Sequence, residues 1–169
     1  MNVELILLAA GFLLTLLFLV SILRFFRKKF RRIPHAVRIK RKIKQLASNS
    51  LEVTPKEFFK IRNATDGKGS KKYISSQYDF SGVYILYNHS KKMYYVGQAV
   101  KTFQRVNNHF TGHGNGDVYA DYKYGDRFTI KMIALKNSRF KTLNELERHT
   151  ISQYDAYAKG YNRTRGNRG

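Results

Sequence analysis

An uninterrupted apolar run near the N-terminus constrains this 169-residue chain more than any other feature. Between Leu5 and Leu23 no residue is charged, and only Gly11, Thr15 and Ser21 interrupt the apolar side chains. A helix of this length, at about 1.5 Å per residue, spans roughly 28 Å, which is close to the thickness of one hydrocarbon core. We therefore predict one transmembrane helix over this run.

A cleaved signal peptide and a buried core helix are the alternatives to a membrane anchor. A secretory signal carries positive charge before its apolar part and a small-residue cleavage site after it. Here Glu4 precedes the run without any Lys or Arg, and Leu23 is followed directly by a basic stretch at 24–32. The positive-inside rule then predicts a short extracytoplasmic N-terminus, residues 1–4, and a cytoplasmic C-terminal domain.

The net charge of +21 at pH 7 comes from two parts of the chain. Between Arg24 and Tyr78, seventeen basic residues stand against three acidic ones. Many of them lie beside the predicted membrane, whose anionic inner leaflet attracts them, so they are a poor indicator of nucleic acid. Between Asp79 and Gly169, fifteen basic residues against seven acidic ones favour a polyanionic partner, with a merely basic soluble surface as the alternative. Cysteine is absent, which excludes disulfides and a cysteine-ligated zinc site.

The segment 24–49 is predicted to be a basic juxtamembrane segment. Pro34 would break or kink any helix that continues from the apolar run. An apolar stripe then recurs at helical spacing, at Ile39, Ile43 and Leu46. We predict an amphipathic helix after Pro34 that lies on the inner leaflet, and a DNA-contacting extension of the domain is the alternative.

The segment 50–78 is predicted to be a lead-in helix and loop. The sequence Thr-Pro-Lys-Glu at 54–57 has the arrangement of a capping box, so a short helix should follow to about Arg62. The glycine-rich sequence at 66–70 is typical of a flexible turn. We expect the core of the compact domain to begin near Asp79.

Two strand patterns, 82–88 and 92–97, are rich in Tyr, Val and Ile and predict a β-hairpin. With a two-residue tip, Tyr84 lies opposite Gly97, and Tyr84 and Tyr95 share one face as diagonal neighbours. Gly97 would then leave a space over Tyr84 that a phosphate could enter. The alternative is that the two tyrosines only pack against each other.

A helix is predicted at about 101–111, with Arg105 and His109 four residues apart on one flank. The Arg fork matches two phosphate oxygens, and His can donate a hydrogen bond or carry a proton. The pair suits a phosphodiester, although such side chains on a helix are usually just solvated. A short helix at 117–124 and a third strand at 128–133 complete this part of the pattern.

The last predicted helix begins at a second capping box, at 142–145, and carries a carboxylate in an unexpected place. Glu147 lies between Leu143 and Ile151 at i+4 spacing, within the stripe that should face the core. A partly buried, unpaired carboxylate is costly unless a cation lies against it. That cation is either Arg105, in a salt bridge, or a divalent metal ion, in a catalytic site.

Together these residues resemble the GIY-YIG endonuclease superfamily over about Ser81 to Gly166. The resemblance rests on an ordered set: Gly82-Val83-Tyr84, Tyr95-Val96-Gly97, Arg105, His109, Glu147 and Gly160-Tyr161-Asn162. Val83 and Val96 stand where Ile is usual, a conservative departure on a strand. None of the DNA-specificity appendages known from homing or repair members is recognisable.

The resemblance implies an α+β fold with a small three-stranded antiparallel sheet flanked by helices, here preceded by the transmembrane helix. It also implies an endonuclease that depends on Mg²⁺ or Mn²⁺, with the metal held by Glu147. Tyr84 would act as, or assist, the general base, and Tyr95 would support its hydroxyl. The residues implied in substrate binding are Gly97, Arg105, His109 and Asn162.

We therefore predict a membrane-anchored endonuclease whose catalytic domain, residues 79–169 with a basic tail, faces the cytoplasm. Its substrate would be DNA, with RNA left open, and the anionic inner leaflet would be a second partner. Tethering at the membrane would suit defence against incoming phage or plasmid DNA. A catalytically inactive nucleic-acid-binding module and a structural membrane-surface protein are the alternatives, and the sequence does not give an oligomeric state.

Overall fold

The computed structural model describes residues 3–30, 34–64 and 78–167, and within the first helix it describes the side chains of residues 12–25 only. The chain divides into two compact units, Met1–Arg38 and Ile39–Gly169. The flexible turn predicted at 66–70 lies outside the described residues.

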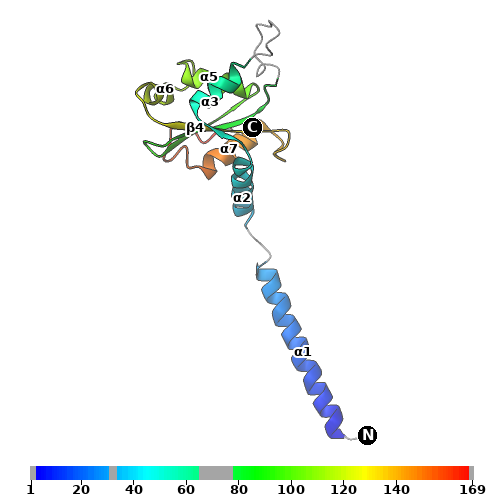
Figure 1. Cartoon of the computed structure of the whole chain (residues 1–169). Coiled ribbons are helices and arrows are strands. Elements are labelled where there is room, and N and C mark those ends of the chain that lie inside the picture. Colours follow the sequence, from blue (N-terminus) through cyan, green and yellow to red (C-terminus); the bar gives the residue numbers. More distant parts are fainter. Residues whose placement is uncertain (1–2, 31–33, 65–77, 168–169) are drawn as a thin grey trace. The chain divides into compact units, whose positions relative to one another are not determined.

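The first unit contains helix α1, which spans Val3–Phe30 (Figure 1). The apolar run at 5–23 lies within this helix, which continues into the basic stretch. The side chains at 12–25 are largely exposed, for example Phe12 at 73% and Leu14 at 68%. Among the residues that the structure describes, no helix combines the length and the apolar character needed to cross a membrane. The transmembrane helix predicted for 5–23 stays a prediction.

The second unit is an α+β domain built on a four-stranded antiparallel sheet with the strand order β1-β4-β2-β3. The strands are β1 (Glu52–Val53), β2 (Gly82–Asn88), β3 (Met93–Ala99) and β4 (Phe128–Ala134). The last three are the predicted strands. The short β1 pairs with β4 and adds a strand from the segment predicted to be only a lead-in, so the three-stranded prediction is one strand short.

Helices cover both faces of this sheet (Figure 1). One face packs against α2 (His35–Ser48) and α7 (Leu143–Gln153), and the other against α3 (Pro55–Arg62), α5 (Thr102–Phe110) and α6 (Gly116–Lys123). Each face has its own buried apolar cluster, which follows from the alternation of side chains along β2. The capping box predicted at the start of α3 is present, with both of its reciprocal hydrogen bonds.

The apolar stripe of α2 is buried inside the domain. Ile43 and Ala47 are 0% and 1% exposed and belong to the same cluster as Val83 of the sheet and Leu146 of α7. The helix predicted after Pro34 is therefore present, but the prediction that its apolar stripe lies on the inner leaflet is wrong. An apolar surface within the protein already covers the stripe, and the basic face of α2 remains exposed.

The β2–β3 hairpin has the predicted register. Tyr84 pairs with Gly97, and Leu86 pairs with Tyr95. Because β3 is an edge strand, side chains from both faces of the sheet can approach each other around its free edge. The candidate site is built around this edge.

Candidate active site

The ring of Tyr84 crosses from the inner strand β2 over Gly97 of the edge strand β3. Tyr84 is 1% exposed, and a Cβ atom at position 97 would clash with its hydroxyl and ring. The space predicted over Tyr84 is therefore filled by the tyrosine itself and is not open to a phosphate. Gly97 serves instead to let the Tyr84 hydroxyl lie over the edge strand.

The Tyr84 hydroxyl is held by His109, which is 0% exposed on α5. The distance from Tyr84 Oη to His109 Nε2 is 2.9 Å, and the backbone N–H of Asn115 donates to His109 Nδ1 over 2.9 Å. A backbone N–H can only donate, so Nδ1 accepts and the proton of the neutral ring is on Nε2. His109 therefore donates to Tyr84, and the hydroxyl proton of Tyr84 remains available to another acceptor.

The loop between α5 and α6 fixes this tautomer of His109. Gly114 packs so closely that a Cβ atom there would lie 2.5 Å from His109 Nδ1 and 2.7 Å from its Cα atom. The next residue, Asn115, also accepts from the N–H of Val118 over 3.0 Å and so caps α6. Asn115 thus caps the start of α6 with its side chain, and its backbone N–H fixes which nitrogen of His109 carries the proton.

Burial keeps His109 neutral. Loss of solvent, together with the positive charge of nearby Arg105, lowers the pKa of His109 to about 4. The ring is therefore an uncharged donor at neutral pH. The predicted phosphate contact of His109 is not what this geometry offers, because both ring nitrogens are already engaged within the protein.

Tyr95 completes the aromatic cluster on the α5 side of the sheet. Its ring centroid lies 4.8 Å from that of His109 and 6.1 Å from that of Tyr84. Burial raises the pKa of both tyrosine hydroxyls, and Arg105 acts in the opposite direction on each. Glu147 also acts on the pKa of Tyr95, which places that hydroxyl within reach of both charges.

Glu147 comes from α7, on the opposite face of the sheet. Gln98 donates through its side-chain amide to Glu147 Oε2 over 3.1 Å and to Asn144 Oδ1 over 2.6 Å. Burial raises the pKa of Glu147, although the backbone N–H groups of Asn167 and Gln98 partly offset this. The carboxylate is thus oriented by neutral donors. Among the ion pairs of the described residues, none joins Arg105 to Glu147, so the salt-bridge alternative has no support.

The donor set around Glu147 fits a magnesium ion held by one carboxylate. The part of the chain that the structure describes has no group of three or more His, Cys, Asp or Glu side chains that could hold a metal ion. Mg²⁺ commonly keeps several waters and binds through one or two carboxylates together with substrate phosphate oxygens. Glu147, half-buried and without a cationic partner among these ion pairs, is suited to that role.

Arg105 and Asn162 differ in how available they are to a substrate. Arg105 is exposed on α5, one helical turn before His109. The side chain of Asn162 makes two hydrogen bonds to the backbone of Val96. It accepts from the Val96 N–H over 2.9 Å and donates to the Val96 carbonyl oxygen over 2.7 Å. Asn162 therefore closes the free edge of β3. The Arg105 side chain acts on the Tyr84 hydroxyl, whose pKa it lowers, and is exposed to a phosphate from solvent.

Asp79, which was not predicted as a functional residue, caps α5 from outside the helix. Lys101 at the N-cap makes no side-chain capping bond. Asp79 accepts instead from the N–H groups of Phe103 over 2.8 Å and Gln104 over 3.1 Å. A carboxylate at a helix N-terminus stabilises it, so Asp79 anchors the helix that carries Arg105. The sequence offered one indication of this cap, because α5 starts without a capping residue of its own.

Comparison with known protein families agrees with this geometry. Residues 80–162 match the family model described as the GIY-YIG catalytic domain. This segment is a GIY-YIG domain. The resemblance drawn from the motifs is thereby confirmed over this segment, which is a GIY-YIG-like endonuclease domain. Searches of curated proteins and of solved structures gave no match.

The GIY-YIG domain gathers its site from four elements. Tyr84 of β2, Tyr95 of β3 and His109 of α5 form one aromatic cluster, with Arg105 beside it. Glu147 of α7 approaches from the other face. Gln98, Asn144 and Asn115, which orient Glu147 and His109, were not found from the sequence, because amide side chains and backbone N–H groups have no distinctive spacing.

We expect the buried neutral His109 to make the stability of the domain sensitive to acid. The unfolded chain takes up a proton near pH 6.5, whereas folded His109 resists protonation down to about 4, so stability falls as the pH falls through this window. Between pH 7 and pH 5 the free energy of unfolding should drop by about 2 kcal/mol through this residue.

Urea denaturation of the full chain at both pH values measures the effect. The His109→Gln variant should lose less stability between pH 7 and pH 5 than the wild type. The exposed His113 in the same loop is the matched control, and His113→Gln should behave as the wild type. Equal losses in all three proteins would contradict a buried neutral His109.

Proposed function

We propose that this GIY-YIG-like endonuclease hydrolyses phosphodiester bonds of DNA with the help of one divalent metal ion at Glu147. The observation that carries the proposal is the hydrogen-bonded series from Asn115 through His109 to the Tyr84 hydroxyl, on the same side of the sheet as the exposed Arg105. A merely structural tyrosine pair does not need a buried histidine with both nitrogens engaged.

The substrate phosphate lies at the β3 edge, between the two faces of the sheet. Arg105 supports this placement because its guanidinium is exposed and can donate to two phosphate oxygens at once. Attack on the phosphorus builds negative charge on these oxygens, and a fixed cation stabilises that charge more in the transition state than before it. Glu147 would hold a divalent metal ion there, which would supply further positive charge and lower the pKa of a bound water.

Tyr84 accepts the proton of the attacking water as it passes its own hydroxyl proton on, through Tyr95, to solvent. Its phenolate form is favoured by the N–H of His109 and by the charge of Arg105, and it is opposed by burial, which raises the Tyr84 pKa. His109 therefore acts by holding the Tyr84 oxygen in place and by donating to it as charge develops there. Tyr95 is less buried and lies nearer to solvent, which suits a relay.

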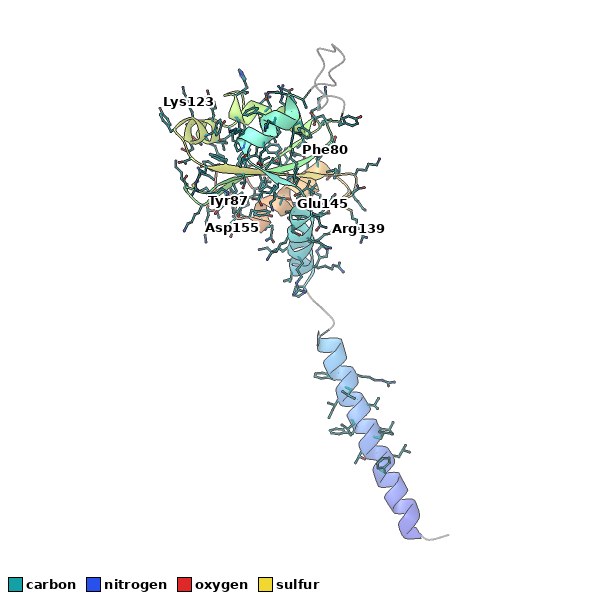
Figure 2. All side chains as sticks on the ribbon, viewed as in Figure 1. Phe80, Tyr87, Lys123, Arg139, Glu145 and Asp155 are labelled. Carbon is teal, nitrogen blue, oxygen red and sulfur yellow. The ribbon has the colours of Figure 1, made fainter. Side chains whose placement is uncertain are left out.

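Nicking of supercoiled plasmid by the full chain in Mg²⁺ tests the mechanism. Tyr84→Phe removes only the hydroxyl and should reduce the nicking rate by about a hundredfold or more, because general-base catalysis contributes at least this much. Tyr87→Phe is its matched control and should leave the rate unchanged. Tyr87 lies on the α7 face of the same strand (Figure 2), whereas α5 with His109 covers the other face.

The metal is tested in the same assay. Glu147→Gln keeps the shape of the side chain and removes its charge, so nicking should be lost, as it should with EDTA. Glu145→Gln, two residues earlier, is the control, because Glu145 accepts from the backbone N–H of Lys141 at the start of the helix. Nicking by Glu147→Gln that survives EDTA would rule out a metal ion at Glu147. Salt-sensitive retention of DNA by a wild-type protein that does not nick would favour a binding module.

The proposal includes anchoring of the endonuclease at a membrane with the GIY-YIG domain in the cytoplasm. It is supported by the uncharged sequence at 5–23, by the exposed apolar side chains described at 12–25, and by the basic residues that follow. An exposed apolar helix surface is stable in lipid and unfavourable in water. An endonuclease at the inner leaflet would meet DNA as it enters the cell, so we propose defence against incoming DNA as its role.

Protease accessibility in intact cells tests the anchor and its orientation. The GIY-YIG domain should resist external protease and become accessible only after the membrane is opened. A full chain that remains soluble after membranes are sedimented would contradict the anchor. Digestion from outside would reverse the orientation, because the basic residues would then lie on the far side of the membrane.

A further inference from the structure

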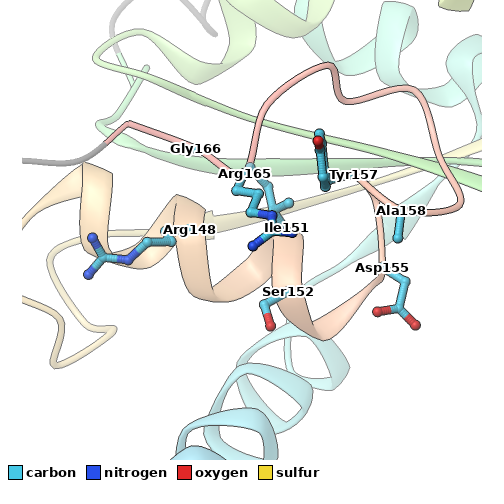
Figure 3. A pocket seen from close by; sticks show the side chains of 8 residues that line it. All are labelled: Arg148, Ile151, Ser152, Asp155, Tyr157, Ala158, Arg165 and Gly166. Carbon is cyan, nitrogen blue, oxygen red and sulfur yellow. The ribbon is translucent and has the colours of Figure 1, made fainter.

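A groove of about 360 Å³ lies between α7 and the C-terminal segment (Figure 3). Arg148, Ile151 and Ser152 line it from α7, and Tyr157, Arg165 and Gly166 line it from the segment that follows. It contains none of the residues of the candidate active site. The groove nevertheless shares α7 with that site, since Arg148 directly follows Glu147 in this helix.

The C-terminal segment forms a packed wall of this groove. Gly166 has a φ of +93°, and a Cβ atom at this position would lie 3.2 Å from the Arg148 Cα atom and 3.3 Å from Ile151 Cδ1. The backbone of the next residue, Asn167, lowers the pKa of Glu147, which places this segment beside that carboxylate. The residues predicted to form a basic tail therefore run along α7 and connect the groove to the catalytic carboxylate.

The lining of the groove combines an apolar floor with a cationic rim. The ring of Tyr157, which is 43% exposed, supplies apolar surface beside the buried Ile151, and the Arg165 guanidinium lies 5.3 Å from the centre of that ring. Bases stack on aromatic rings and on guanidinium planes, while Arg also binds phosphate. Asp155 lies at the opposite end from Arg148 in Figure 3 and disfavours a phosphate there, so a bound phosphate belongs at the Arg148 end.

We propose that this groove binds an unpaired nucleotide of the substrate strand beside the bond that is cut. A paired base is stacked within the duplex and cannot reach an apolar floor, whereas an unpaired base can turn into the groove while its phosphate contacts the arginines. The endonuclease therefore prefers DNA in which the strand next to the cut is unpaired. This inference rests on the proposed function, because it assigns the groove to the same substrate.

Fluorescence anisotropy in EDTA measures the preference without cleavage. The probes are two labelled DNA oligonucleotide duplexes of equal length, one fully paired and one with a short unpaired stretch at its centre. The full chain should bind the second about tenfold more tightly, as expected for a stacked base. Arg165→Ala, which removes the guanidinium over Tyr157, should bring this ratio close to one.

Two further variants separate the groove from general positive charge. Ser152→Trp fills the groove without changing the charge and should also abolish the preference. The exposed Arg127 lies outside the groove, so Arg127→Ala should weaken binding of both duplexes together and keep the ratio. Equal binding of the two duplexes by the wild type would overturn the proposal, as would a ratio that survives Ser152→Trp.

The failure of this inference is distinguishable from failure of the proposed function. Plasmid nicking in Mg²⁺, measured on the same wild-type preparation, tests the nuclease by itself. Nicking without any preference for the unpaired duplex would overturn the groove alone. A preference lost in both groove variants, in a wild-type protein that does not nick, would support the groove and overturn the hydrolytic function.

Discussion

The site depends on one hydrogen bond, from the backbone N–H of Asn115 to Nδ1 of His109. It assigns the proton of the neutral ring to Nε2, and therefore makes His109 the donor and Tyr84 the acceptor in the 2.9 Å contact between them. Without it the ring could turn or change tautomer, and the Tyr84 hydroxyl would lose its fixed partner. The close approach of Gly114 and the capping of α6 by Asn115 both serve to keep this bond in place.

The edge position of β3 brings charges from two faces of one sheet together. Gly97 lets the buried Tyr84 ring lie across the strand, and Gln98, the next residue, reaches Glu147 on the other face. Consecutive residues of one strand point to opposite faces, so a single strand orients both the hydroxyl and the carboxylate. The backbone N–H of Tyr161 and the side chain of Asn162 then cover the remaining edge, which keeps an otherwise unpaired strand from associating with another chain.

Local patterns predicted much of this arrangement. The hairpin register followed from the tip length, and the unusual position of Glu147 followed from helical periodicity, because both depend on neighbours in sequence. Partners distant in sequence were not predictable. The stripe at Ile43 could cover a membrane or a core, and only the tertiary fold decides between them. Likewise, the lack of a side chain at Gly97 indicates that another group approaches the backbone closely there. It does not distinguish a substrate from Tyr84.

The protonation state of His109 is the most direct test of the account. Nitrogen-15 NMR of the full chain with labelled histidine, recorded at pH 7, distinguishes the two neutral tautomers and the charged ring. The account predicts a neutral His109 with its proton on Nε2 and a bare Nδ1, with no change until the pH approaches about 4. A proton on Nδ1, or a charged ring at neutral pH, would contradict it.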